Sequence, residues 1–329
     1  MKHSKVICIG EALIDRIVNT SENRSINYFG GAPANVACAL SKLKIQSSFI
    51  GNLGNDCYGS QFLELFRKLE IDTSILQIDK KFETRIVEVL RDKDGDRSFS
   101  GFAKNKYDFF ADEVLEKSFL KKNLSSLQKL YSDSKFIVTG TILLASCKSS
   151  ESLSFLMNYA KNFDIKIVID LNWREVFWET SSAIRFSKRE DQIKKIRGFL
   201  SFADILKLSK EEADMFFENN SPREISSSFP KTPDVVITNG GDPIKWCING
   251  FEGKSNVDYS GEIIDTTGAG DAFLAGLISQ MFYFNEPISE LDIQKAIKFA
   301  CACGFLTCQS EGAIEPQPVY NRVHEFIYF

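Results

Sequence analysis

The sequence lacks the residues and runs on which several large classes of protein depend. Only two histidines occur in 329 residues, and no two of the eight cysteines have Cys-x-x-Cys spacing, which argues against a structural zinc site. Long Lys/Arg tracts are absent and the net charge is −4, which argues against non-specific binding of nucleic acid. The apolar run 6–18 is too short, and too often interrupted by charges, for a signal peptide or a membrane span. These absences predict a soluble cytoplasmic protein whose cysteines are mostly small apolar fillers.

Short apolar runs alternate with longer helix-like stretches. The runs expected to form strands are 5–10, 47–51, 135–140, 166–171, 204–208 and 234–238. The expected helices include 33–43, 58–70, 151–163, 190–200, 210–218 and 293–308. This order predicts an α/β fold with a mostly parallel sheet covered by helices on both faces. Several strands end in glycine or polar residues, and ligands of such sheets bind at the carboxyl ends of the strands.

Two segments interrupt the alternation. Residues 84–91 and 97–102 flank an Asp- and Gly-containing turn at 92–96, which predicts a hairpin, and a second extended stretch covers 17–29. Neither segment could bury a core alone, so we expect one domain over 1–329. A further hairpin is predicted at 243–259, with Asn249-Gly250 as its turn.

The segment from Thr266 to Asp271, Thr-Thr-Gly-Ala-Gly-Asp, indicates an anion site. Gly268 and Gly270 keep side chains away, so that backbone N–H groups can converge on a negative group, and a helix expected from Asp271 adds its positive dipole end. Asp271 has two interpretations. It could cap that helix, or it could be a general base that removes a proton from a hydroxyl attacking a bound phosphate.

A second glycine cluster lies at Phe29-Gly30-Gly31-Ala-Pro-Ala-Asn35. It could be an ordinary turn that enters a helix, with Pro33 as an early helical residue, or a loop in which the backbone approaches a ligand. Asn35 offers both a donor and an acceptor suited to sugar hydroxyls. Together the two clusters resemble the paired signatures of the PfkB carbohydrate kinase family, Gly-Gly-x-x-x-Asn and Asp-Thr-x-Gly-Ala-Gly-Asp.

The resemblance covers nearly the whole chain. Segments 8–15, 170–178, 206–213 and 235–240 resemble further family motifs, and Asp170-Leu-Asn-Trp-Arg174 in particular resembles bacterial and plant fructokinases. This resemblance implies a ribokinase-like three-layer sandwich with a mostly parallel central sheet and a small β lid over the sugar. The lid would comprise about 17–29 and 84–107. Its hairpin carries charged Arg85 and Arg97 and apolar Ile86 and Val87, and we expect it to close over a bound sugar.

The resemblance also assigns roles to residues. Asp271 would be the base, and Gly268, Ala269 and Gly270 would donate backbone hydrogen bonds to the transferred phosphoryl group. The sugar would contact Asp15, Gly30, Gly31, Asn35, Lys104 and Arg174. The nucleotide would contact Lys207, Ser209, Thr238, Gly240, Gly268 and Gly270. Glu212 would orient water around Mg²⁺, and Asp265 and Thr267 match positions that bind a monovalent cation such as K⁺ in some relatives. Arg174 and Lys104 could equally be surface residues.

The implied activity is ATP-dependent phosphorylation of a sugar hydroxymethyl group, with D-fructose, giving fructose 6-phosphate, as the first expectation. Ribokinase, 2-keto-3-deoxygluconate kinase and nucleoside kinase are alternatives that share the fold and the base but differ in the sugar pocket. A non-catalytic relative that acts as an interaction protein is the alternative from another class. The intact Asp271 and its two glycines argue against it. The expected partners are the sugar and ATP, with no nucleic acid and no membrane, and an exposed lid edge would suit a homodimer.

Overall fold

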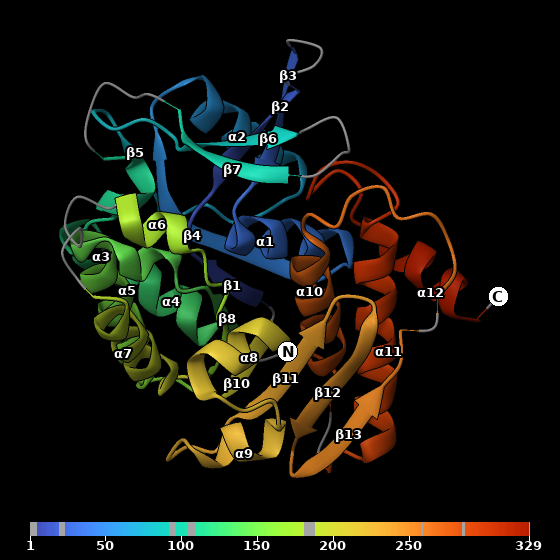
Figure 1. Cartoon of the computed structure of the whole chain (residues 1–329). Helices are drawn as coiled ribbons and strands as arrows, with labels where there is room; N and C mark the ends of the chain where they lie inside the picture. Colours follow the sequence, from blue (N-terminus) through green and yellow to red (C-terminus); the bar gives the residue numbers. More distant parts are fainter. Residues whose placement is uncertain are drawn as a thin grey trace.

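The structure is a computed structural model that describes residues 5–19, 24–91, 97–103, 109–180, 188–257, 259–284 and 287–328. A nine-stranded sheet has the order β13-β12-β11-β10-β9-β8-β1-β4-β5 (Figure 1). Its strands are β1 (Lys5–Ile9), β4 (Gln46–Gly54), β5 (Leu76–Asp79), β8 (Ser134–Thr139), β9 (Lys166–Asp170), β10 (Ile205–Ser209), β11 (Asp234–Asn239), β12 (Asp242–Ile248) and β13 (Phe251–Ser255). The strands from β11 to β5 pair in parallel, and β12 and β13 extend one edge in antiparallel. The predicted mostly parallel sheet and the hairpin at Asn249-Gly250 are therefore confirmed.

Both faces of the sheet are buried, and the side chains of β1 alternate between them. Val6 and Cys8 belong to one apolar core cluster, whereas Ile7 and Ile9 belong to the other. The first cluster packs against α1 (Ala32–Lys42), α2 (Cys57–Lys68), α10 (Ala269–Met281), α11 (Glu290–Thr307) and α12 (Tyr320–Tyr328). The second packs against α3 (Lys117–Lys122), α4 (Leu124–Ser132), α5 (Cys147–Ala160), α6 (Glu175–Thr180), α7 (Arg189–Leu200), α8 (Lys210–Phe217) and α9 (Pro222–Ser227). Helices thus cover both faces, and the expected three layers are present.

A second sheet of four strands has the order β3-β2-β6-β7 and lies at the top in Figure 1. Its strands are β2 (Leu13–Asn19), β3 (Arg24–Gly30), β6 (Ile86–Arg91) and β7 (Arg97–Phe102). The antiparallel pairing of β6 with β7 confirms the predicted hairpin. Within the predicted extended stretch 17–29 the described residues belong to β2 and β3, and residues 20–23 lie outside the described part. Turn residues 92–96 and the segment 104–107 lie outside the described residues.

The predicted elements agree with the observed ones to within a few residues, with two kinds of difference. Helix α10 begins at Ala269, two residues before the expected start at Asp271, because Gly268 already serves as its N-cap. Elements α3, α4, α6, α9, α12 and β5 have no counterpart among the predicted segments. Each has at most nine residues, so each offers too few positions for a clear periodic pattern.

Candidate active site

The four-stranded sheet and the carboxyl ends of β1, β9 and β10 line one cavity of about 600 Å³. Its walls include Asp15 and Val87 from the four-stranded sheet and Asn35 from α1. The segment after β9 and the residues that lead into α10 complete the lining, with Arg174 and Asp271 among them. The cavity therefore lies where an α/β sheet is expected to bind its ligand.

The start of α10 projects into this cavity. Gly268 is the N-cap with φ 76°, a left-handed conformation that favours glycine, and a Cβ there would lie 2.8 Å from the Ala313 Cα atom. Asp271 lies in the first turn, and no side chain caps the helix, so the interpretation of Asp271 as the N-cap is wrong. The first N–H groups of a helix have no acceptor within it, and they carry the positive dipole end. The helix end can therefore bind an anion, with a carboxylate beside it.

Asn35 holds Asp271 directly, although the two residues are far apart in the sequence. The Asn35 Nδ2 atom donates to the Asp271 Oδ2 atom at 2.8 Å. Asn35 is 4% exposed, and its Oδ1 atom has no hydrogen-bond donor among the residues that the structure describes. Gly31, with φ 97°, begins α1 and leaves no space for a Cβ, which would lie 2.5 Å from the Glu11 carbonyl oxygen. The amide of Asn35 thus orients the carboxylate and presents an unfilled acceptor.

The environment of Asp271 raises the pKa of its carboxyl group to about 6. Burial is the main cause, because protein surrounds the carboxylate even though part of it faces the cavity. Asp170 raises the pKa further, whereas the hydrogen bond from Asn35 and the charges of Lys207 and Arg174 lower it. A carboxylate with this pKa is ionised at neutral pH and is a stronger base than an exposed aspartate.

Lys207 and Asp170 form a buried ion pair between neighbouring strands. They are register partners on β10 and β9, and the Lys207 Nζ atom lies 2.8 Å from the Asp170 Oδ2 atom. Burial disfavours the ammonium, but Asp170, Glu212 and Asp271 outweigh it and raise the pKa of Lys207. A Cβ on Gly270 would lie 3.0 Å from the Nζ atom, so the ammonium lies against the first turn of α10. The Asp170 Oδ1 atom is buried and has no donor within the described part of the chain.

Ser209 and Glu212 form a capping box at the start of α8. The Ser209 hydroxyl accepts from the Glu212 N–H at 3.1 Å, and the Glu212 Oε2 atom accepts from the Ser209 N–H at 2.8 Å. The Glu212 Oε1 atom accepts from the Trp173 N–H at 2.7 Å, so the carboxylate also fixes the segment after β9. Burial and the nearby Asp170 raise the pKa of Glu212. The Ser-x-x-Glu spacing is typical of a capping box, so the sequence alone could have predicted this pairing.

Two further residues predicted for the sugar, Asp15 and Arg174, line the cavity. The Asp15 carboxylate lies over Gly30, where a Cβ would be 2.2 Å from the Oδ2 atom, so Gly30 provides space for it. Arg174 is exposed and lines the cavity. Lys104 lies outside the described residues.

The residues predicted for the nucleotide and for a monovalent cation are divided between two places. Asp265 and Thr267 line the cavity, and the Asp265 Oδ1 atom accepts from the Thr267 N–H at 3.0 Å and from its hydroxyl at 2.7 Å. Thr238 and Gly240 do not line it. The Thr238 hydroxyl donates to the Leu208 carbonyl oxygen at 3.3 Å, and Gly240 is exposed. These two residues mark an open region at the ends of β10 and β11.

Residues 311–317, which we call the strap, join three parts of the site. The Gly312 N–H donates to the Asp265 Oδ2 atom at 3.0 Å, and the Tyr28 hydroxyl of β3 binds Glu311 at 2.7 Å. The Gln317 Nε2 atom donates to the Asn35 carbonyl oxygen at 2.9 Å. In addition, the Lys42 ammonium of α1 donates to strap carbonyl oxygens, those of Ile314, Glu315 and Gln317. The strap therefore links the four-stranded sheet, α1 and the loop before α10.

Sequence reasoning missed Glu11 as a residue of the site, although it follows β1 directly and is polar. Glu11 is 1% exposed, lines the cavity and accepts from the Ala32 N–H at 3.0 Å. Burial raises the pKa of Glu11 to about 8, and the charges of Asp112 and Asp271 also raise it, whereas backbone hydrogen bonds lower it. Glu11 is therefore largely protonated at neutral pH. Its position at a strand end was the signal that could have identified it.

No helix within the described ranges is long and apolar enough to cross a membrane. The same residues contain no group of three or more His, Cys, Asp or Glu side chains that could hold a metal ion by themselves.

Comparisons with known proteins agree with the observed fold. The sequence model of the pfkB family of carbohydrate kinases matches residues 3–319. Probable fructokinase-6 of Arabidopsis thaliana, a chloroplastic protein, is 29% identical over 97% of this chain and 81% of its own length. Fructokinase of Xylella fastidiosa with bound ATP has the same fold, with a TM-score of 0.85 at 24% identity over 98% of each chain. A double mutant of fructokinase from Vibrio cholerae, in a form with fructose, ADP and a potassium ion, has a TM-score of 0.81 at 25% identity over 99% of each chain.

Proposed function

The chain belongs to the pfkB family of carbohydrate kinases, and from this premise we propose that it phosphorylates D-fructose with ATP to give fructose 6-phosphate. The observation that carries the proposal is the pair formed by Asn35 and Asp271, 2.8 Å apart at the start of α10. It combines a base, an acceptor for a sugar hydroxyl and a site for an anion. A kinase needs all three within reach of one another.

Asp271 acts as the general base of the transfer. Asn35 engages one of its carboxylate oxygens, which turns the other toward the acceptor hydroxyl. The base removes the proton as the hydroxyl oxygen attacks the γ-phosphorus atom, and ADP leaves. Backbone N–H groups at Gly268 and Gly270 donate to the developing charge, and the Lys207 ammonium beside Gly270 adds a positive charge there. The Ala269 N–H donates to the Thr266 carbonyl oxygen at 3.2 Å, so it has to exchange that partner before it can join them.

The residues near Lys207 also suit Mg²⁺ bound through water. The buried Asp170 Oδ1 atom lacks a donor in the described structure, so it can accept from a metal-bound water. Glu212, the predicted second partner of such waters, keeps lone pairs beyond its bonds to Ser209 and Trp173. Mg²⁺ would neutralise charge on the ATP phosphates. Asp265 and Thr267 remain our proposed site for K⁺, an ion present in the Vibrio cholerae structure.

The charges around the cavity support an uncharged acceptor. Carboxylates line it at Asp15, Asp170 and Asp271 among others, whereas Glu11 is largely protonated, and the cations among the described lining residues are Arg174 and Lys207. Lys207 is already paired with Asp170. A sugar acid such as 2-keto-3-deoxygluconate would bring a further negative charge, whereas fructose would bring none. Apolar Val87 and Val89 face the same space and would cover a small sugar.

We extend the proposal to the organisation of the protein in the cell. We propose one kinase domain over 1–329, with a lid formed by about 17–29 and 84–107, in a cytoplasmic enzyme. The four-stranded sheet ends in β3 and β7, and we propose that a homodimer forms through it. Light scattering of the purified protein would report a mass of one chain if this last proposal is wrong.

The decisive experiment is a coupled assay of ADP release with fructose, ribose, 2-keto-3-deoxygluconate, fructose 6-phosphate and adenosine as acceptors. The matched control is the Asp271→Asn protein, purified in the same way, which removes the signal of contaminating kinases. We expect fructose to give the highest kcat/KM and fructose 6-phosphate as the product. A higher value with another acceptor would replace fructose. ADP release equal to that of the control with every acceptor would favour the non-catalytic interaction protein.

A further inference from the structure

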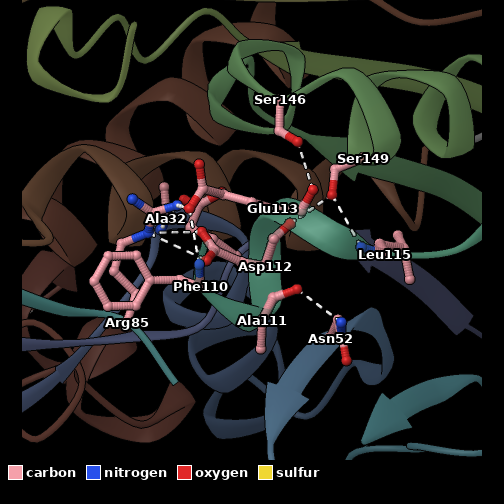
Figure 2. Close-up of polar contacts among 11 residues, drawn as sticks. Ala32, Asn52, Arg85, Phe110, Ala111, Asp112, Glu113, Leu115, Ser146 and Ser149 are labelled. Atoms are coloured by element: carbon pink, nitrogen blue, oxygen red, sulfur yellow. Dashed lines mark hydrogen bonds and ion pairs between the residues drawn. The ribbon is translucent and has the colours of Figure 1, made fainter. Parts of the chain in front are cut away.

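Arg85, the residue before β6, is buried at the base of the four-stranded sheet. It is 4% exposed, and its guanidinium pairs with two carboxylates of the 3₁₀ helix at Ala111–Val114 (Figure 2). The Nε atom lies 2.9 Å from the Asp112 Oδ2 atom, and the Nη2 atom lies 3.2 Å from the Glu113 Oε2 atom. Arg85 therefore faces this short helix, and it is not among the described residues that line the cavity.

Three phenylalanine rings surround the same guanidinium. The rings of Phe102 and Phe177 lie 4.8 Å from its central carbon, and the ring of Phe110 lies at 4.7 Å. At these distances the cation is attracted to the ring faces, and desolvation strengthens the attraction. Phe102 belongs to β7, and Phe177 belongs to α6 on the main body. Arg85 thus contacts both parts of the molecule at once.

The carboxylates that hold Arg85 are themselves fixed. The Ala111 carbonyl oxygen accepts from Asn52 of β4 at 2.7 Å, and the Asp112 carbonyl oxygen accepts from Ser149 of α5 at 2.6 Å. The Ser146 hydroxyl donates to the Glu113 carbonyl oxygen, as Figure 2 shows. Polar side chains of the main body thus fix this short helix. Its two carboxylates can therefore hold the arginine in a fixed position relative to the main body.

Arg85 connects the 3₁₀ helix at Ala111–Val114 to the acceptor side of the cavity. Its carbonyl oxygen accepts from the Ile14 N–H at 2.9 Å, and the next pair in register is Asp15 with Val87, both of which line the cavity. On the other side of the guanidinium, Phe177 also lines the cavity, three residues after Arg174. The guanidinium therefore lies between the strand pair that carries Asp15 and the helix that follows Arg174.

We propose that Arg85 is a positioning residue for the acceptor. It fixes where Asp15 and Val87 lie over the cavity relative to α6. This inference rests on the proposed kinase function. A buried ion pair contributes little net stability compared with apolar residues of similar size, whereas its directional contacts specify one geometry. A planar guanidinium with two carboxylates along its edges and rings on its faces is suited to such a role.

The test is Arg85→Lys, which keeps the charge but removes the planar fork. We expect the KM for fructose to rise about tenfold and the KM for ATP to stay within about twofold, since misplacement of the acceptor weakens its binding selectively. Without any ligand, amide hydrogen exchange should accelerate together in β6 and in α6. The matched control is Arg16→Lys in the same sheet, where Arg16 pairs with the half-buried Glu88 at 3.3 Å. We expect neither effect there.

A second variant covers the case in which Arg85→Lys does not fold. Phe110→Leu removes one ring from the guanidinium without changing charge, and Phe110 does not line the cavity. It should shift the fructose KM and the exchange of β6 and α6 in the same directions, by a smaller amount. A lowered melting temperature with an unchanged fructose KM and unchanged exchange in α6 would overturn the proposal. If the parent enzyme does not phosphorylate fructose, the proposed function fails, and exchange in β6 and α6 still decides the role of Arg85.

Discussion

The acceptor side of the cleft is more enclosed by protein than the side that we assign to the nucleotide. On the acceptor side Glu11 and Asn35 are buried beneath the four-stranded sheet, and the pKa of Asp271 is raised. On the nucleotide side Gly240 lies at the surface, and Thr238 is half-buried. The contrast follows from the chemistry, because water competes with the sugar as a nucleophile and must be excluded around the acceptor. ATP brings its own charges and can bind at an open surface.

If the enclosed side performs the chemistry, removal of its base should have the largest effect. Asp271→Asn keeps the size of the side chain but removes the basic carboxylate. We expect kcat to fall by roughly 10²-fold or more, the scale of general-base loss. Steady-state assays with both substrates saturating would measure this fall, and circular dichroism would check that the fold is retained. Near-normal turnover would remove Asp271 from the mechanism.

The next largest effect should be on the affinity for the sugar. Asn35→Ala and Asp15→Ala should each weaken fructose binding by about 1–3 kcal/mol, the cost of an unpaired polar group in a closed site. Nucleotide affinity should change little. Separate calorimetric titrations with fructose and with ATP would measure both. Lost ATP binding with unchanged fructose binding would reverse our assignment of the two sides.

The pH dependence should also originate on the enclosed side. Asp271 must be ionised to act as a base, and its pKa is raised to about 6. We therefore expect kcat to be constant above that pH and to fall about tenfold per pH unit well below it. A kcat profile between about pH 4.5 and 8, at saturating substrates, would test this. A profile that is flat down to about pH 4.5 would show that a carboxyl group with an ordinary pKa, or none, controls the step.

The open side should tolerate change best. Thr238→Ala removes a hydroxyl that donates to the Leu208 carbonyl oxygen at 3.3 Å, near the surface. We expect the KM for ATP to rise only about two- to fivefold, as for the loss of one exposed hydrogen bond, with kcat and the fructose KM unchanged. A larger loss of kcat in Thr238→Ala than in Asn35→Ala would contradict the contrast between an enclosed acceptor side and an open nucleotide side.

The sequence predicted what depends on short stretches of chain. Gly31, Asn35, Gly268 and Asp271 were predicted from local motifs, and the alternation of apolar runs predicted the parallel sheet. The approach of Asn35 to Asp271 joins residues 236 positions apart, so no local pattern could give it. For Arg85, the sequence showed only a charged residue in a hairpin that was expected to close over a sugar. Its burial depends on rings and carboxylates from other elements, which local patterns do not encode.

The strap at 311–317 has a consequence for how the protein is made. Translation delivers the glycine loops, Asn35 and Asp271 first, and the strap follows them. Before Gly312 and Gln317 emerge from the ribosome, Asp265 lacks one of its backbone donors and the Asn35 carbonyl lacks its side-chain partner. A nascent chain therefore carries every reactive group of the site before it acquires the bonds that hold those groups in register. We expect the ability to consume ATP to appear only after the strap has been synthesised.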